Sequence, residues 1–288
     1  MAHTQSQTKS IPNLLALAVT LCGALALPNT ALAGKGASYQ SISNALATGH
    51  RDSIIAELER AEKLPCAPCI DLVRPLVDHD DAAVRDVAAW WLSKRAIRDQ
   101  VRDEMFARLT AGNSVAARNA AEVLGRFKHP DALMPLELAI HDGALSDDAR
   151  VAATNAVGTI GDFRGKALLE GAITSESAPV RAAAAKALRG IRGNADGIAV
   201  VELLGDDDEQ VVREAAVTIG VLRETAALAD LARVVTDASF SPAVRKEAAW
   251  ALGNIRDGSV RDVLKQVIAE DPSMLVRGTA RAALANLR

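Results

Sequence analysis

One short segment recurs along most of the chain and limits what the chain can fold into. In residues 244–255 the apolar side chains stand at offsets 0, 4, 7, 8 and 11, which is one face of a helix with 3.6 residues per turn. The fifth residue of every copy is alanine and the ninth is aliphatic. This pattern predicts helices that approach their neighbours closely. Its copies begin at intervals of 31 to 33 residues, at Val84, Ala116, Ala149, Val180, Val211, Val244 and Val276.

A period near 32 residues leaves room for two helices of about 12 residues and two turns. A second apolar stripe, from Val260 to Ile268, follows the copy that starts at Val244. The chain is 49% apolar but only 3% aromatic, which favours thin layers of small side chains over one deep core. The sequence therefore predicts an all-α fold, an α-solenoid of about seven stacked helical hairpins.

The repeated segments resemble a known repeat family. Residues 180–188, Val-Arg-Ala-Ala-Ala-Ala-Lys-Ala-Leu, and their six sister segments are similar to the short HEAT-like repeats of the phycobilisome lyase type. The resemblance covers residues 52–288 and implies that the second helix of each hairpin lines the concave face. We took the stripe following each repeated helix as that second helix. Partner contacts are therefore expected at Glu137, Glu170, Glu202, Arg233, Arg261 and Lys265.

An arginine stands one or two residues after the start of every copy. HEAT-like repeats commonly use such arginines to tie neighbouring units together, and acids of the preceding turns lie nearby in sequence, namely Asp81, Asp148 and Asp208. We expect a structural role for all seven, which are Arg85, Arg118, Arg150, Arg181, Arg213, Arg245 and Arg277.

The N-terminal region has the features of a secretory signal peptide over residues 1–33. Lys9 precedes an uncharged run from Leu14 to Leu27, and Ala31-Leu32-Ala33 supplies a cleavage site after Ala33. The run is shorter than the approximately 20 apolar residues of a spanning helix. The sequence therefore predicts a periplasmic or secreted protein without a membrane anchor after cleavage.

The remaining chain divides at the first repeat. Residues 34–51 are small and polar, and we expect them to form a flexible leader. An atypical first hairpin is expected over 52–79, repeats from residue 80, and an incomplete last unit over 272–288 that lacks its partner helix.

Cys66 and Cys69 are the two cysteines of the predicted mature chain. An even number of cysteines in an exported protein favours a disulfide, which here closes a very small loop. Two alternatives remain open. The Cys-x-Pro-Cys spacing also suits a redox-active pair, and thiolates can bind a metal.

No residue set in the sequence has the pattern of a catalytic or metal site. One enzyme family with HEAT-like repeats, deoxyhypusine hydroxylase, holds two irons with repeated His-Glu pairs, and no His-Glu pair occurs in this sequence. The histidines after residue 33 stand at predicted helix ends and turns: His50, His79, His129 and His141. We therefore expect no catalytic, cofactor-binding or metal-binding residues.

These observations lead to an expected function. The net charge of −3 argues against nucleic-acid binding. We expect an exported, non-enzymatic scaffold or adaptor whose partner is another protein. Two alternatives are a cofactor-handling protein, by resemblance to the bilin lyases or as a metalloprotein chaperone, and a thiol–disulfide protein that uses Cys66 and Cys69. A chromophore in the purified protein would indicate the first, and a high reduction potential the second.

Overall fold

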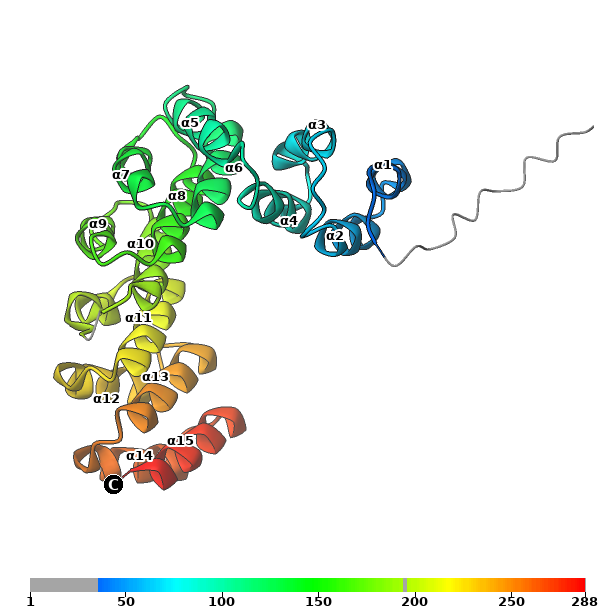
Figure 1. Ribbon diagram of the computed structural model, residues 1–288. Coiled ribbons are helices and arrows are strands. Elements are labelled where there is room, and N and C mark those ends of the chain that lie inside the picture. The colour runs from blue at the N-terminus through cyan, green and yellow to red at the C-terminus, as the bar shows by residue number, and fades with distance from the viewer. Residues whose placement is uncertain (1–35, 194–195, 288) are drawn as a thin grey trace, which may run out of the picture. The chain divides into compact units, whose positions relative to one another are not determined.

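The computed structural model describes residues 36–193 and 196–287 (Figure 1). The predicted signal peptide, residues 1–33, lies outside this part of the chain. Contacts divide the chain into residues 1–36 and a compact unit of residues 37–288, and every element below belongs to the second unit. All regular structure among the described residues is helical, so the predicted α-solenoid is confirmed. None of these helices is long and apolar enough to cross a membrane.

Each copy of the apolar stripe forms one helix, called here a repeated helix. The alanine at its fifth position is fully buried in every copy, from Ala88 in the first to Ala280 in the last. The predicted close approach of these helices is therefore confirmed. The repeated helices are α4 (Ala82–Leu92), α6 (Ser114–Phe127), α8 (Asp147–Ile160), α10 (Ala178–Ala187), α11 (Glu209–Leu222), α13 (Pro242–Ile255) and α15 (Met274–Asn286).

The outer helices alternate with the repeated helices, and all but α9 pack mainly against the repeated helix that follows, whereas α9 packs about equally on α8 and α10. For example, α12 packs on α13 and α14 on α15, whereas the packing of a repeated helix on the next outer helix is much less extensive. The repeated helix is therefore the second helix of its hairpin. The outer helices are α5 (Arg98–Leu109), α7 (Leu133–His141), α9 (Gly165–Ala172), α12 (Leu228–Thr236) and α14 (Arg261–Glu270), with the 3₁₀ turns η4 (Ile198–Val200) and η5 (Glu202–Gly205) before α11.

This pairing corrects two expectations. The last unit is not incomplete, because α14 is the partner of α15. The apolar stripes that were expected to form the second helix of each hairpin form the first helix instead. Periodicity locates both helices of a repeat but carries no information about which neighbour shares the larger contact.

The N-terminal part of the unit also differs from expectation. Residues 39–48 are not a flexible leader but helix α1 (Tyr39–Thr48), which packs on α2 (Arg51–Arg60). Ser38 and Ser41 form a capping box at its start, and Ile42 is only 1% exposed. The sequence pattern does not predict this helix, because one buried isoleucine and a serine cap produce no apolar stripe with the period of a helix. The described part of the solenoid therefore begins at α1, and α3 (Cys69–Val73) with the 3₁₀ turn η1 (Arg74–Asp78) precedes α4.

Glycines hold several repeated helices close together. At the tenth position of four repeated helices a glycine meets the eighth-position alanine of the next repeated helix. A β carbon on Gly158 would lie 2.8 Å from the Cα of Ala187, a distance that real β carbons essentially never show. Three of the four positions therefore require glycine for a steric reason, and at Gly125 the nearest atom would be 3.0 Å away, which leaves little room. The pairs are Gly125 with Ala156, Gly158 with Ala187, Gly220 with Ala251, and Gly253 with Ala283.

Three repeat arginines join one unit to the next in the same way. Arg85 binds Glu122, Arg181 binds Asp206 and Arg245 binds Asp271, with Nε–O distances of 2.6, 2.7 and 2.8 Å. Each also donates to main-chain carbonyls of the turn before its own helix, as Arg181 does to the carbonyls of residues 175 and 176. The hydrogen bond from Arg181 holds the pKa of Asp206 below its usual range. The partner acids thus lie in the following unit, not in the preceding turn as expected.

Two further arginines make related contacts but pair with no acidic side chain of a following unit, although Arg150 lies 3.4 Å from Asp147 of its own helix. Arg150 donates to Ser175 Oγ at 3.0 Å and Arg277 to the Asp271 carbonyl at 2.5 Å. Arg118 and Arg213, which stand two residues after the stripe begins, bind only the nearby side chains of Asn119 and Gln210. These two contacts lie within one helix and do not join one unit to the next, because the extra residue rotates the two arginines around the helix.

Candidate functional site

Two hollows lie side by side on the repeated helices. Hollow I, of about 430 Å³, is lined by residues of α4, α6 and α8, and hollow II, of about 350 Å³, by residues of α8, α10 and α11. Asp148, Val151 and Asn155 of α8 line both, so the two hollows are continuous at α8. The repeated helices follow one another along the chain in Figure 1, which shows α6, α8, α10 and α11 in succession. This joined surface is the candidate functional site.

Most charged groups in the hollows are already bound to other groups of the protein. In hollow I Arg126 lies 3.4 Å from Asp86, and Glu122 accepts from Arg85. This hydrogen bond raises the pKa of Arg85 despite its burial, so that guanidinium is charged at any ordinary pH.

Hollow II contains a similar set of bound carboxylates. Glu214 is paired with Arg189 at 2.5 Å. Asp208 accepts from the main-chain N–H groups of Gln210 and Val211, at 2.8 and 3.2 Å, as the N-cap of α11. The negative charge of Asp208 is therefore committed to the start of its helix.

Three charged side chains of the hollows have no oppositely charged partner among the described residues and, unlike Asp208, do not cap a helix. Arg118 of α6 donates only to the Asn119 amide oxygen, at 3.0 and 3.1 Å. The carboxylate of Asp148 and the ammonium of Lys186 on α10 are exposed and have no hydrogen bond or ion pair within the ranges described. These three groups on consecutive repeated helices are free to bind a ligand.

The six residues expected to contact a partner lie elsewhere. They are on outer elements, from Glu137 on α7 to Lys265 on α14, and none lines either hollow. Three of the six are in ion pairs within their own helix: Glu170 with Lys166, Arg233 with Asp230, and Lys265 with Asp262. The structure does not bring Glu137, Glu202 and Arg261 together, because each is on a different outer element.

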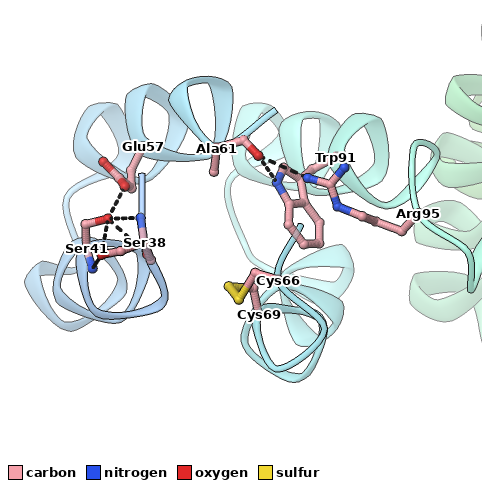
Figure 2. Close-up of a disulfide and its surroundings, with 8 residues drawn as sticks. All are labelled: Ser38, Ser41, Glu57, Ala61, Cys66, Cys69, Trp91 and Arg95. Carbon is pink, nitrogen blue, oxygen red and sulfur yellow. Dashed lines mark hydrogen bonds between the residues drawn. A yellow bond between two sulfur atoms is a disulfide. The ribbon is translucent and has the colours of Figure 1, made fainter. Parts of the chain in front are cut away.

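The two cysteines meet at the start of α3 (Figure 2). Their sulfurs are 1.97 Å apart and their Cα atoms 5.3 Å apart, and Cys69 is fully buried whereas Cys66 is partly exposed. The connection that contains them begins at Ala61, whose carbonyl accepts from Trp91 Nε1 at 3.1 Å and from Arg95 Nη2 at 3.0 Å. Arg95 also stacks on the Trp91 ring, 3.7 Å from its centroid. This connection anchors α2 to α4, and neither cysteine lines a hollow.

The buried carboxylate of Glu57 joins the first two helices. Ser41 of α1 donates to Glu57 Oε1 at 2.5 Å (Figure 2). Arg60 pairs with the same carboxylate. Glu57 is 8% exposed, so these contacts satisfy a carboxylate that burial would otherwise destabilise. The group is structural.

The histidines do not converge on a site. His79 and His129 use Nδ1 to accept main-chain N–H groups of the turns that follow, from Asp81 at 3.0 Å and from Asp131 at 3.3 Å. His50 precedes α2, and His141 ends α7. No group of three or more His, Cys, Asp or Glu side chains in the described part of the chain is placed to hold a metal ion.

Comparison with protein families identifies the repeats. The family model described as HEAT repeats matches residues 143–218 and 214–285. This half of the chain therefore consists of HEAT repeats, and the helices before it continue the same alternation.

The similar curated proteins are enzymes. Deoxyhypusine hydroxylase of Gallus gallus is 35% identical over 123 residues, which are 43% of this chain and 40% of the relative. The Homo sapiens enzyme is 36% identical over 101 residues, 35% of this chain and 33% of the relative. The chain thus spans a third to two fifths of these relatives. The expectation of a non-enzymatic scaffold is wrong on this finding, because the repeats are similar to those of enzymes.

One solved structure agrees with the fold. A chain of the Kap95p–RanGDP complex superposes with a TM-score of 0.52 at 14% identity, covering 85% of this chain and 37% of that one. The phycocyanin lyase complex of CpcE and CpcF from Nostoc sp. PCC7120 gives a TM-score of 0.42 at 19% identity, over 76% of this chain and 94% of that chain. At these identities the first likeness shows the solenoid fold alone.

The iron set implied by the relatives does not fit this chain. Irons held by repeated His-Glu pairs were expected for a deoxyhypusine hydroxylase, and this chain has no His-Glu pair. The hollows are lined instead by carboxylates, arginines, a lysine, Asn155 and Thr159. We therefore assign no reaction step to iron.

Lys186 was not expected among the site residues, Arg118 was expected only as a structural arginine, and Asp148 was expected to be an arginine partner, yet all three line the hollows. Their polar positions on the repeated helices were a usable signal, because residues outside the apolar stripe of a second helix face the hollows. The wrong helix order concealed it.

Proposed function

We propose that the chain is an enzyme whose substrate binds in hollows I and II. The observation that carries the proposal is the similarity of its repeats to those of deoxyhypusine hydroxylases, which are hydroxylases by name. The hollows support it, since together they offer a continuous surface with free charged groups on three successive helices. The reaction is a modification of a bound substrate by chemistry that does not use His-Glu iron ligands.

Asp148 occupies the central place in this proposal. It stands where the two hollows join, and its carboxylate has no partner within the described ranges. It would bind a positively charged or hydrogen-bond-donating group of the substrate, while Arg118 and Lys186 would bind groups of opposite character. A side chain in this position orients the substrate, and orientation together with proximity can lower a reaction barrier by about 7–11 kcal/mol.

The test compares three proteins acting on a soluble extract of the source cells from which the gene for this chain has been deleted. Wild type, Asp148→Asn and Glu202→Gln are added separately, and untargeted mass spectrometry follows all species. Glu202→Gln is the matched control, because it removes an exposed carboxylate outside both hollows. We expect a species that wild type and the control convert and that Asp148→Asn converts at least tenfold more slowly. The proposal fails when no species changes, or when Asp148→Asn converts as fast as the control.

Two further properties belong to the same proposal. We propose that residues 1–33 direct export and are removed after Ala33, which the N-terminal sequence of the protein recovered from its cells would test.

We also propose that the Cys66–Cys69 disulfide forms after export, in an oxidising compartment, and stabilises the connection from α2 to α3. The closeness of the two sulfurs supports this.

A further inference from the structure

We propose that the substrate of the site is a polypeptide segment that carries one basic side chain between two acidic ones. This inference rests on the proposed function and names the class of substrate. Its basis is the order of the three free charges on consecutive repeated helices: positive Arg118 on α6, negative Asp148 on α8, and positive Lys186 on α10. A ligand complementary to this order is acidic, basic and acidic along its length.

The spacing of the three groups follows from the repeat. Relative to the stripes, Asp148 precedes the first residue of its copy, Arg118 is the third residue of its copy and Lys186 the seventh. With a rise of about 1.5 Å per residue and neighbouring axes about 9 Å apart, the Cα atoms of Arg118 and Asp148 are about 10 Å apart. The same estimate gives about 14 Å between Asp148 and Lys186. An extended chain covers these distances in about three and four residues.

The other charges of the hollows do not change this order. Asp86, Glu122 and Glu214 are each paired with an arginine, and Asp208 caps α11. A ligand gains little from displacing these pairs, because each separation would leave a charge without its partner. The three free groups therefore determine the charge pattern that is recognised.

The rest of the surface suits a polypeptide. Between the charged groups the hollows are lined by small apolar and amide side chains, including Val151, Ala152, Asn155 and Ala182. Main-chain amide groups of a bound polypeptide can hydrogen-bond to the Asn155 side chain, and short side chains of the polypeptide fit over the alanines of the hollows. A nucleic acid places negative charge along its whole backbone and would be repelled by Asp148.

The experiment measures binding of labelled peptides to the full chain. One peptide carries Glu, Lys and Glu separated by two and by three neutral residues, and a second carries Lys, Glu and Lys at the same positions. We expect wild type to bind the first at least tenfold more tightly. Asp148→Asn should lose about tenfold in affinity for the first peptide, which is the usual effect of removing one charge-assisted contact. Glu202→Gln should lose none.

A charge reversal makes the test independent of folding. Asp148→Lys should reject the first peptide and bind a variant in which its central Lys is replaced by Glu, and circular dichroism should show unchanged helix content. In a double-mutant cycle, Lys186→Gln and replacement of the last Glu of the peptide by Gln should each weaken binding, and the two losses should not add.

Several outcomes would overturn the inference. These are equal affinity for the two peptides, an equal loss in Asp148→Asn and Glu202→Gln, no rescue in the reversed pair, or tighter binding of a single-stranded oligonucleotide than of the first peptide. The proposed function fails separately. When the extract assay shows an Asp148-dependent conversion but the peptides do not bind as stated, the enzyme proposal stands and the substrate class is wrong.

Discussion

The glycine contacts between repeated helices give a prediction with an internal reference. Gly158 and Gly278 are both inside repeated helices, but a β carbon on Gly158 would lie 2.7–2.8 Å from atoms of Ala187, whereas one on Gly278 would meet nothing within 4 Å. Replacing an exposed helical glycine by alanine stabilises a helix by about 0.8–1 kcal/mol. Gly278→Ala should show this gain alone.

Gly158→Ala has the same gain in helix propensity and, in addition, the cost of overpacking. Because the obstructing atoms include the main chain of Ala187, α8 and α10 must move apart, and such overpacking costs about 1–3 kcal/mol. The propensity contribution cancels between the two variants. The difference between their free energies of unfolding should therefore be about 1–3 kcal/mol, with Gly158→Ala the less stable.

Urea denaturation followed by circular dichroism measures this difference. The corresponding difference in melting temperature is about 2–12 °C for a chain of this size. Equal stability of the two variants would refute the reasoning, because it would show that α8 and α10 are not in contact at these positions.

Three further predictions concern the ion pairs and the cysteines. Arg245→Ala should destabilise the protein by about 3–5 kcal/mol in urea denaturation, because it leaves the buried Asp271 without its partner. Arg233→Ala, which removes an exposed ion pair, should cost less than about 1 kcal/mol. Similar losses in the two variants would contradict the structural role of the repeat arginines. Stability should fall as the pH drops from about 4 towards 2, because hydrogen bonds lower the pKa of Asp206, and the hydrogen bonds from Arg164 lower the pKa of Asp162 to about 2. Carboxylates with lowered pKa values stabilise the fold above their unfolded pKa and lose this contribution as they are protonated, so a urea midpoint that rises on acidification would contradict the assignment. Replacing Cys66 and Cys69 by alanine should cost about 2 kcal/mol, the chain-entropy value for a loop of this size, and intact-mass measurement should show the wild-type chain lighter by two hydrogen atoms than its reduced form.

The fold could be predicted from the sequence because the copies of the repeat can be compared with one another within a single chain. Seven copies with alanine at one position and an aliphatic residue at another specify both a helix and its close neighbour. The buried alanines at that position confirm the prediction. The first helix, α1, was missed because its single buried residue, Ile42, gives no period.

The candidate site was less accessible to sequence reasoning. The order of helices within a hairpin depends on the relative extent of two packing interfaces, which a hydrophobic pattern does not reveal. Because the order of the two helices was assigned wrongly, partner contacts were expected on the outer helices and not at Arg118, Asp148 and Lys186. The partners of Arg85, Arg181 and Arg245 were missed for a similar reason, since each lies 25 to 37 residues further along the chain.

Hydrogen exchange of the protein, with and without the Glu–Lys–Glu peptide at saturation, tests most directly whether the repeated helices form the functional surface. We expect the peptide to slow exchange in residues 114–127, 147–160 and 178–187, which are α6, α8 and α10. We expect no change in residues 228–236 and 261–270, which are the outer helices α12 and α14 that carry Arg233, Arg261 and Lys265. Protection confined to the outer helices would show that the hollows are not the site.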